Sequence, residues 1–79
     1  MKLNMPYMYC IRNEIKFDEE EKEHVVYGIE AVDTTGEILL SFSDVFFDKQ
    51  KAEDFVNLCN SGRLSLLHFA DVVEDVLAE

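Results

Sequence analysis

The chain has 79 residues, with 17 acidic and 7 basic side chains, so its formal net charge is −10. A chain this short forms at most one domain, spanning 1–79, with a modest core. A hydrophobic content of 48% is too high for a disordered chain. The negative charge opposes binding to nucleic acids and to anionic membrane surfaces, because phosphate groups repel it. Proteins with basic surfaces remain compatible as partners.

The sequence predicts neither export nor membrane insertion. Residues 1–9 contain one lysine and no apolar stretch of signal-peptide length. No apolar run approaches the ~20 residues that a membrane span needs. Cys10 and Cys59 lie on different predicted elements, and neither has a CxxC neighbour. We therefore expect a cytoplasmic protein with both thiols reduced.

Three stretches of alternating apolar residues predict strands, because successive side chains of a strand point to opposite faces. The predicted strands cover about residues 7–17, 24–32 and 37–42, and the third aligns Ile38, Leu40 and Phe42 on one face. Residues 1–6 are expected to be irregular, since Pro6 cannot donate a ladder hydrogen bond. Short connections favour an antiparallel meander.

The connecting segments carry their own signals. Residues 18–23 read Asp-Glu-Glu-Glu-Lys-Glu, and such a run of like charges predicts a solvated loop. Residues 33–36 read Asp-Thr-Thr-Gly, which is typical of a tight turn. Gly28, inside the second strand, predicts a bulge or a close approach of another backbone. Residues 43–47 include three large apolar side chains and are expected to form a partly buried connector.

Two helical patterns follow, over about residues 48–60 and 65–78. Asp48 is the expected N-cap of the first helix, and Gly62 is expected to supply its left-handed stop. Ser65 is expected to open the second helix. One apolar stripe per helix recurs at i, i+3, i+4 and i+7: Ala52, Phe55, Val56 and Cys59, then Phe69, Val72, Val73 and Val76. Leu64 and Phe69 occupy the positions of a hydrophobic staple.

These elements predict the fold class α+β: a three-stranded antiparallel meander followed by two C-terminal helices packed on one face (β-β-β-α-α). Two short helices cover one face of such a sheet. The other face carries apolar residues at alternating positions, which indicates a contact surface. Arg12, Glu14, Lys16 and Glu30 lie among these apolar residues, so a face that is simply exposed to solvent is the alternative. The residues expected to form this interface are Met8, Cys10, Val26, Gly28, Val32 and Leu39. An edge strand offers a second route to pairing.

Catalytic and metal-binding patterns are weak in this sequence. Cys59 and His68 would lie on neighbouring helices, but a Cys–His dyad also needs an orienting group and an oxyanion hole. Cys10, His24, Cys59 and His68 are the residue types of a zinc site, yet they are scattered singly rather than in close pairs. We therefore expect no catalytic residue, no metal and no cofactor.

Several short segments give the chain a family resemblance. They are Tyr27-Gly28-Ile29, the Asp-Thr-Thr-Gly turn, Ser43-Asp44-Val45, Leu58-Cys59-Asn60, and Leu64-Ser65 through Val73-Glu74-Asp75. Over roughly residues 7–77 the chain resembles a small family of uncharacterised proteins from anaerobic Gram-positive bacteria. Because that family is one of unknown function, the resemblance implies no activity and no site residues.

The sequence favours a non-enzymatic protein-interaction or regulatory module that binds a protein partner, including a second copy of itself as a homodimer. One alternative is an acidic decoy that occupies a basic surface, which would need carboxylates arrayed like phosphates over one continuous surface. A third is a small thiol or hydrolytic enzyme, which would need a pocket joining a thiol or hydroxyl to a histidine.

Overall fold

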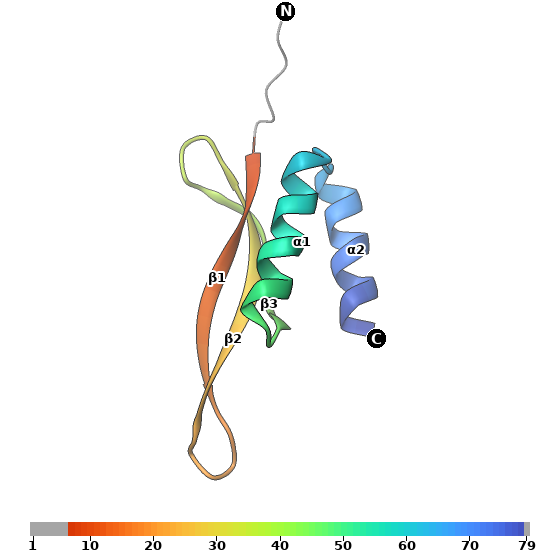
Figure 1. Cartoon of the computed structure of the whole chain (residues 1–79). Coiled ribbons are helices and arrows are strands. Elements are labelled where there is room, and N and C mark those ends of the chain that lie inside the picture. Colours follow the sequence, from red (N-terminus) through yellow and green to blue (C-terminus); the bar gives the residue numbers. More distant parts are fainter. Residues whose placement is uncertain (1–6, 79) are drawn as a thin grey trace, which may run out of the picture.

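The computed structural model describes residues 7–78, and Figure 1 shows five elements in them. The elements are β1 (Tyr7–Phe17), β2 (Glu23–Asp33), β3 (Ile38–Phe46), α1 (Lys49–Ser61) and α2 (Leu66–Ala78). The strands form one antiparallel sheet in the order β1-β2-β3. The predicted α+β meander followed by two helices is confirmed. The irregular start expected for residues 1–6 lies outside the described residues.

Both helices lie on the same side of the sheet, as predicted (Figure 1). The buried core sits between the two layers and is centred on Phe69, which is fully buried. The Phe69 ring lies 4.4 Å from that of Tyr9 and 5.7 Å from that of Phe42, measured between ring centroids. The other buried members of this cluster are Ile29, Ala31, Ala52, Val56, Cys59 and Val73. Aromatic rings therefore join the second helix to the sheet.

The two helices begin at the predicted caps. The Asp48 carboxylate accepts a hydrogen bond from the Gln50 backbone N–H at 2.9 Å. The Ser65 hydroxyl accepts one from the His68 backbone N–H at 3.2 Å. Each cap satisfies an N–H group that has no partner within its helix. Leu64 and Phe69 both pack on the core, in agreement with the expected staple.

The first helix ends differently from the prediction. Gly62 keeps a right-handed conformation, with φ −82°, and Arg63 takes the left-handed one, with φ 50°. The N–H of Leu64 donates to the carbonyl of Cys59 at 3.1 Å, and the N–H of Arg63 to that of Asn60 at 3.2 Å. This is the hydrogen-bond pattern of a Schellman motif with Arg63 in the position that usually holds glycine. The expected stop at Gly62 was wrong by one residue, because α1 continues through Ser61.

Arg63→Gly is expected to stabilise the chain by about 0.5–1 kcal/mol. A residue with a Cβ is strained at positive φ, and glycine is not, although glycine loses more chain entropy on folding. The measurement is the free energy of unfolding from urea denaturation. Arg63→Ala is the matched control: it removes the same side chain but keeps the Cβ, so it should bring no gain. Equal effects of the two variants would contradict the explanation.

The third strand is longer than predicted because it contains a large irregularity. Ile29 pairs with Phe42, but Tyr27 pairs with Phe46, so the segment from Ser43 to Val45 bulges out opposite Gly28. A Cβ on Gly28 would lie 2.5 Å from the Phe42 carbonyl oxygen, which confirms the expected close backbone approach. The connector predicted over residues 43–47 is therefore mostly strand.

The bulge is held by side chains of β1. Asp44 has φ 58°, and its N–H donates to the Glu14 carboxylate at 3.0 Å. The Asp44 carboxylate in turn accepts from the Lys16 ammonium at 2.8 Å. Beyond the bulge, Phe46 packs beside Phe55 of α1, with ring centroids 5.4 Å apart. Phe47, expected to be partly buried, is 80% exposed, and it lies in the short link between the end of β3 and the Asp48 cap of α1.

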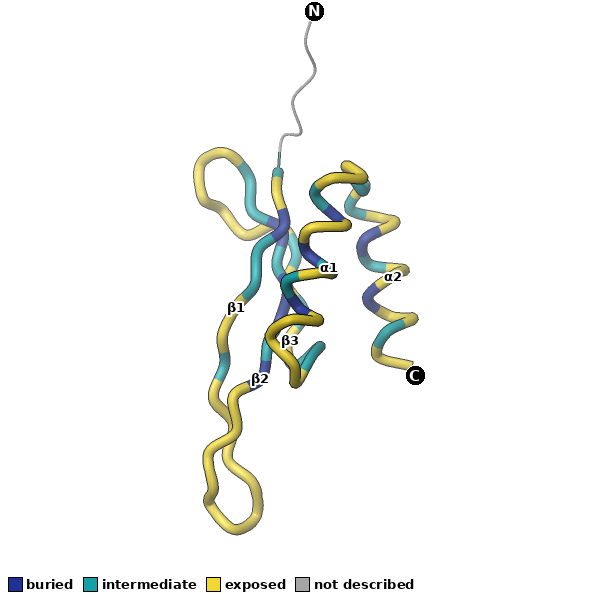
Figure 2. The backbone as a smooth tube through the Cα atoms, in the orientation of Figure 1, coloured by how far each residue is buried: buried dark blue, intermediate teal, exposed yellow. Residues whose placement is uncertain are grey.

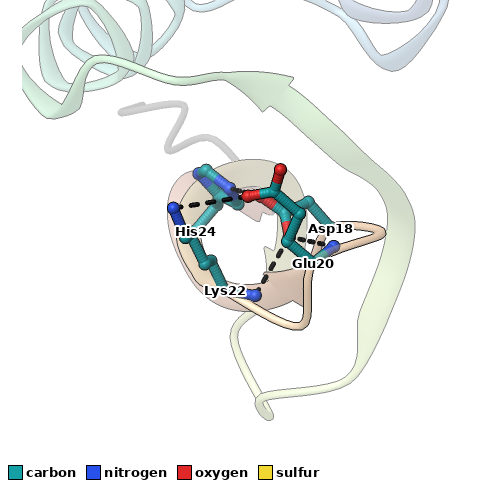
Figure 3. A network of polar contacts seen from close by, with 4 residues as sticks. All are labelled: Asp18, Glu20, Lys22 and His24. Atoms are coloured by element: carbon teal, nitrogen blue, oxygen red, sulfur yellow. Dashed lines mark hydrogen bonds and ion pairs between the residues drawn. The ribbon is translucent and has the colours of Figure 1, made fainter.

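The loop between β1 and β2 is organised by one carboxylate, Asp18 (Figure 3). One of its oxygens accepts from the backbone N–H groups of Glu20 and Lys22, at 2.8 and 3.0 Å. The other lies 2.8 Å from His24 Nε2. These hydrogen bonds, first of all that from His24, lower the pKa of Asp18 below its ordinary value. The run of acids thus forms the solvated loop expected, with Asp18 as its internal acceptor.

The Asp18 network gives a pH dependence of definite sign. Because the folded-state pKa lies below the unfolded one, its stabilisation is complete above the unfolded value and disappears as the pH falls through the folded value. We expect His24→Ala to move the Asp18 pKa upward in an NMR titration. Asp33 is the internal control, because its lowered pKa arises first from Thr35 and should not change. An Asp18 titration unaffected by the substitution would contradict the assignment.

Candidate interaction surface

The sheet has a second face, which points away from the helices. Met8 pairs with Val32, and Val32 pairs with Ile38, so these apolar residues cross all three strands. A register shift beside Val32 moves Ile38 onto this face, which corrects the predicted alignment of Ile38 with Leu40. We use the name apolar row for the accessible residues Met8, Cys10, Val32, Ile38 and Leu39.

Members of the apolar row are reachable by a partner to different degrees. Met8 is 57% exposed, Ile38 49% and Leu39 39%. Cys10 and Val32 are half-buried. Four of the six residues predicted for the interface therefore lie together on this face, and Ile38 joins them. Sequence periodicity missed Ile38, because a β-bulge shifts the alternation by one residue.

The other two predicted residues, Val26 and Gly28, are not accessible. Val26 is 2% exposed, and Gly28 is buried beneath the Ser43 segment of the bulge. The bulge lies against Gly28, and because both residues are buried, an approaching protein could not touch either one. The surface is consequently shorter than predicted and is confined to the end of the sheet near the Asp33–Gly36 turn.

Charged side chains border the apolar row on the same face. The Arg12 guanidinium lies 3.9 Å from a carboxylate oxygen of Glu14 and 3.8 Å from one of Glu30. Arg12 is about half exposed, whereas the two carboxylates are mostly covered. At these long separations, and with the guanidinium half in water, the two ion pairs add little stability. An apolar centre with a charged border is, however, the usual anatomy of a protein–protein contact.

A hollow of about 350 Å³ lies at one end of the apolar row. Met8 and Val32 contribute to its wall, together with Tyr7, Asp33, Thr34 and Asn60. Two of its polar side chains are engaged elsewhere: Asp33 accepts from Thr35 and Glu37, and Asn60 bonds to Tyr9. The remaining wall is mainly apolar, which suits an inserted apolar side chain rather than a charged ligand.

The geometry does not favour the dyad or metal-site hypotheses. Cys59 is 2% exposed within the core, and burial raises the pKa of its thiol, the opposite of nucleophile activation. His68 is exposed on α2, while Cys10 lies on the second face. Within residues 7–78, no group of three or more Cys, His, Asp or Glu side chains is placed to hold a metal ion.

The acidic residues are dispersed over the surface and several are committed to internal contacts. Asp18 and Asp33 organise loops, Asp48 caps a helix and Asp44 bonds Lys16. Exposed acids without such roles lie on several elements: Glu19, Glu21 and Glu23 around the β1–β2 loop, Glu37 before β3, and Asp71, Glu74 and Asp75 on α2. This distribution differs from the continuous array of carboxylates that a phosphate mimic requires.

Fold and surface together define a small α+β domain, a three-stranded meander with two helices on one face and an apolar row on the other. A family model, the family of unknown function DUF6514, matches residues 2–79, so the chain belongs to that family. No curated protein and no solved structure matches it. Within the described residues, no helix is both long enough and apolar enough to span a bilayer.

Proposed function

We propose that this domain is a non-enzymatic protein-interaction module, with the apolar row as its contact surface. The observation that carries the proposal is the accessibility of Met8, Ile38 and Leu39 on a sheet face that the helices leave open. A small domain gains proportionally more than a large one from covering such residues with a partner. The proposal assigns the domain to the cytoplasm, where its free thiols, Cys10 and Cys59, remain reduced.

The partner that fits this surface is a protein segment with a large apolar side chain. Inserted in the hollow beside Met8 and Val32, that side chain would act as the anchor on which binding energy concentrates. Arg12 and Glu30 at the border would set orientation and specificity more than affinity. A net charge of −10 favours basic groups around the anchor and a faster encounter at low salt.

The test compares proteins captured from host-cell extract by three immobilised chains: wild type, Met8→Glu and Leu67→Glu. Leu67 is the matched control because it is 74% exposed on α2, away from the apolar row. We expect wild type and Leu67→Glu to retain the same proteins, identified by mass spectrometry, and Met8→Glu to lose them. Circular dichroism should show all three chains folded. Retention of the same proteins by Met8→Glu would overturn the proposal.

A further inference from the structure

The outer edge of β1 is a second surface, independent of the apolar row. The N–H and C=O of Tyr9 both point away from β2 and bond the Asn60 side chain, at 2.9 and 3.0 Å. Backbone groups alternate along a strand, so those of Asn13, Ile15 and Phe17 point to the same side. All three residues are exposed. From Asn13 onward, β1 therefore presents an open template for another strand.

The part of the hairpin that carries this edge extends beyond the helices (Figure 1), and Figure 2 shows it exposed. Ile15 and Val25 face each other across β1 and β2 on the helix-side face. Ile15 is 61% exposed, Val25 51% and Phe17 64%. We call these three residues with the adjoining edge of β1 the hairpin arm. A strand added here would lie beside apolar side chains that the fold itself leaves uncovered.

A second copy of β1 fits this edge in one register. In a symmetric antiparallel pair, the residue on the twofold axis fixes the register. With Asn13 on the axis, Phe17 of the second copy would take the place that Asn60 already fills beside Tyr9. With Glu14 on the axis, the two Glu14 carboxylates would face each other, a like-charge contact that destabilises a sheet.

The register with Ile15 on the axis satisfies both constraints. Glu14 then lies opposite Lys16 of the second copy, and Lys16 opposite Glu14, so opposite charges meet twice. Ile15 meets Ile15, and Asn13 lies opposite Phe17, with the outward N–H and C=O groups of each pair correctly placed to exchange hydrogen bonds. Val25, Ile15, Ile15 and Val25 would form one apolar stripe across four strands. Strand β1 of the second chain ends at Phe17, opposite Asn13, so it does not reach the place beside Tyr9 that Asn60 occupies.

The geometry points to homodimerisation through the hairpin arms, with β1 strands paired antiparallel about Ile15 to form a continuous six-stranded sheet. The contact is short, so the dimer forms at micromolar rather than nanomolar chain concentration. Self-pairing occurs where the net charge of −10 opposes it least, because β1 carries Arg12 and Lys16 against a single acid, Glu14. Both apolar rows then lie on the same face of the shared sheet.

Oxidative cross-linking tests the register. In a Cys10→Ser background, Ile15→Cys places two thiols on the axis within disulfide range. Asn13→Cys is the matched control: its two thiols would lie four residues out of step, roughly 13 Å apart along the strands. We expect a covalent dimer from Ile15→Cys and monomer from Asn13→Cys on a nonreducing gel. Two outcomes would overturn the inference: a covalent dimer that forms only with Asn13→Cys, or no covalent dimer with either variant.

Sedimentation equilibrium tests dimerisation without cross-links. Wild type is expected to be dimeric at high micromolar concentration. Ile15→Pro removes an outward N–H and leaves the β1–β2 ladder intact, because proline is tolerated on the open side of an edge strand. That variant should be monomeric with an unchanged circular dichroism spectrum. A monomeric wild type would refute the dimer. It would not affect the proposed interaction surface, which the Met8→Glu capture experiment tests separately.

Discussion

Phe69→Ala is expected to lower the free energy of unfolding by about 3–5 kcal/mol, the cost of removing a fully buried aromatic ring. Phe69 is 0% exposed and has Tyr9, Phe42 and Phe55 rings within 6.4 Å between centroids. The substitution removes its staple with Leu64 and its contact with the sheet together. Because small domains have narrow stability margins, a large fraction of the chains should be unfolded near body temperature.

Urea denaturation followed by circular dichroism measures this loss. Leu67→Ala is the matched control on the same helix, since Leu67 is 74% exposed and its truncation should change stability by less than about 0.5 kcal/mol. Similar losses for the two variants would show that α2 packs on the sheet through a different face.

Asn60→Ala is expected to destabilise the fold by about 2–3 kcal/mol, although it removes only a small polar side chain. The Asn60 carboxamide accepts from the Tyr9 N–H and donates to the Tyr9 carbonyl, so it acts as a one-residue neighbouring strand. Truncation leaves both partly buried backbone groups without a partner, and each such loss costs about 1–3 kcal/mol. Because water can reach this edge and bond both Tyr9 groups, the expected loss of stability is smaller than the sum of the two separate costs.

The matched control for Asn60 is Asn57→Ala, an exposed asparagine one turn earlier on α1. Its effect on urea denaturation should lie within about 0.5 kcal/mol of zero. Asn60→Asp adds a second comparison: it keeps an acceptor for the Tyr9 N–H but turns a carboxylate oxygen toward the Tyr9 carbonyl. We expect it to be as damaging as Asn60→Ala. An Asn60→Asp variant as stable as wild type would contradict the proposed bonding.

Much of this fold could be predicted because its determinants are local. Asp48 and Ser65 predict the helix starts, because each side chain accepts a hydrogen bond from a backbone N–H only two or three residues further along the chain. The Asp33–Gly36 turn follows equally from its own side chains, with Gly36 at φ 92° and the Asp33 carboxylate accepting from Thr35. Alternation alone placed Ile29 and Ala31 on the face of β2 opposite Val32, and both residues are fully buried.

Features that depend on distant residues escaped prediction. The bulge at Ser43 and Asp44 needs Glu14 and Lys16, which lie about 30 positions earlier in the chain and show no local sign of the contact. That bulge lies against Gly28, one of the residues predicted for the interface. The hydrogen bond between Asn60 and Tyr9 spans 51 positions. An asparagine near the end of a helix is common, so the sequence gives no sign of this contact.

The Asn60–Tyr9 contact also has a consequence for synthesis of the chain. The β1–β2 hairpin is complete once residue 33 has left the ribosome, but its edge at Tyr9 stays open until residue 60 follows, an interval on the order of seconds. During that interval a nascent hairpin on one ribosome can pair with its neighbour on a polysome along the full length of β1. A delay in the emergence of residues 34–60 from the ribosome should therefore increase aggregation of newly made chains, while a delay in the residues after 60 should not.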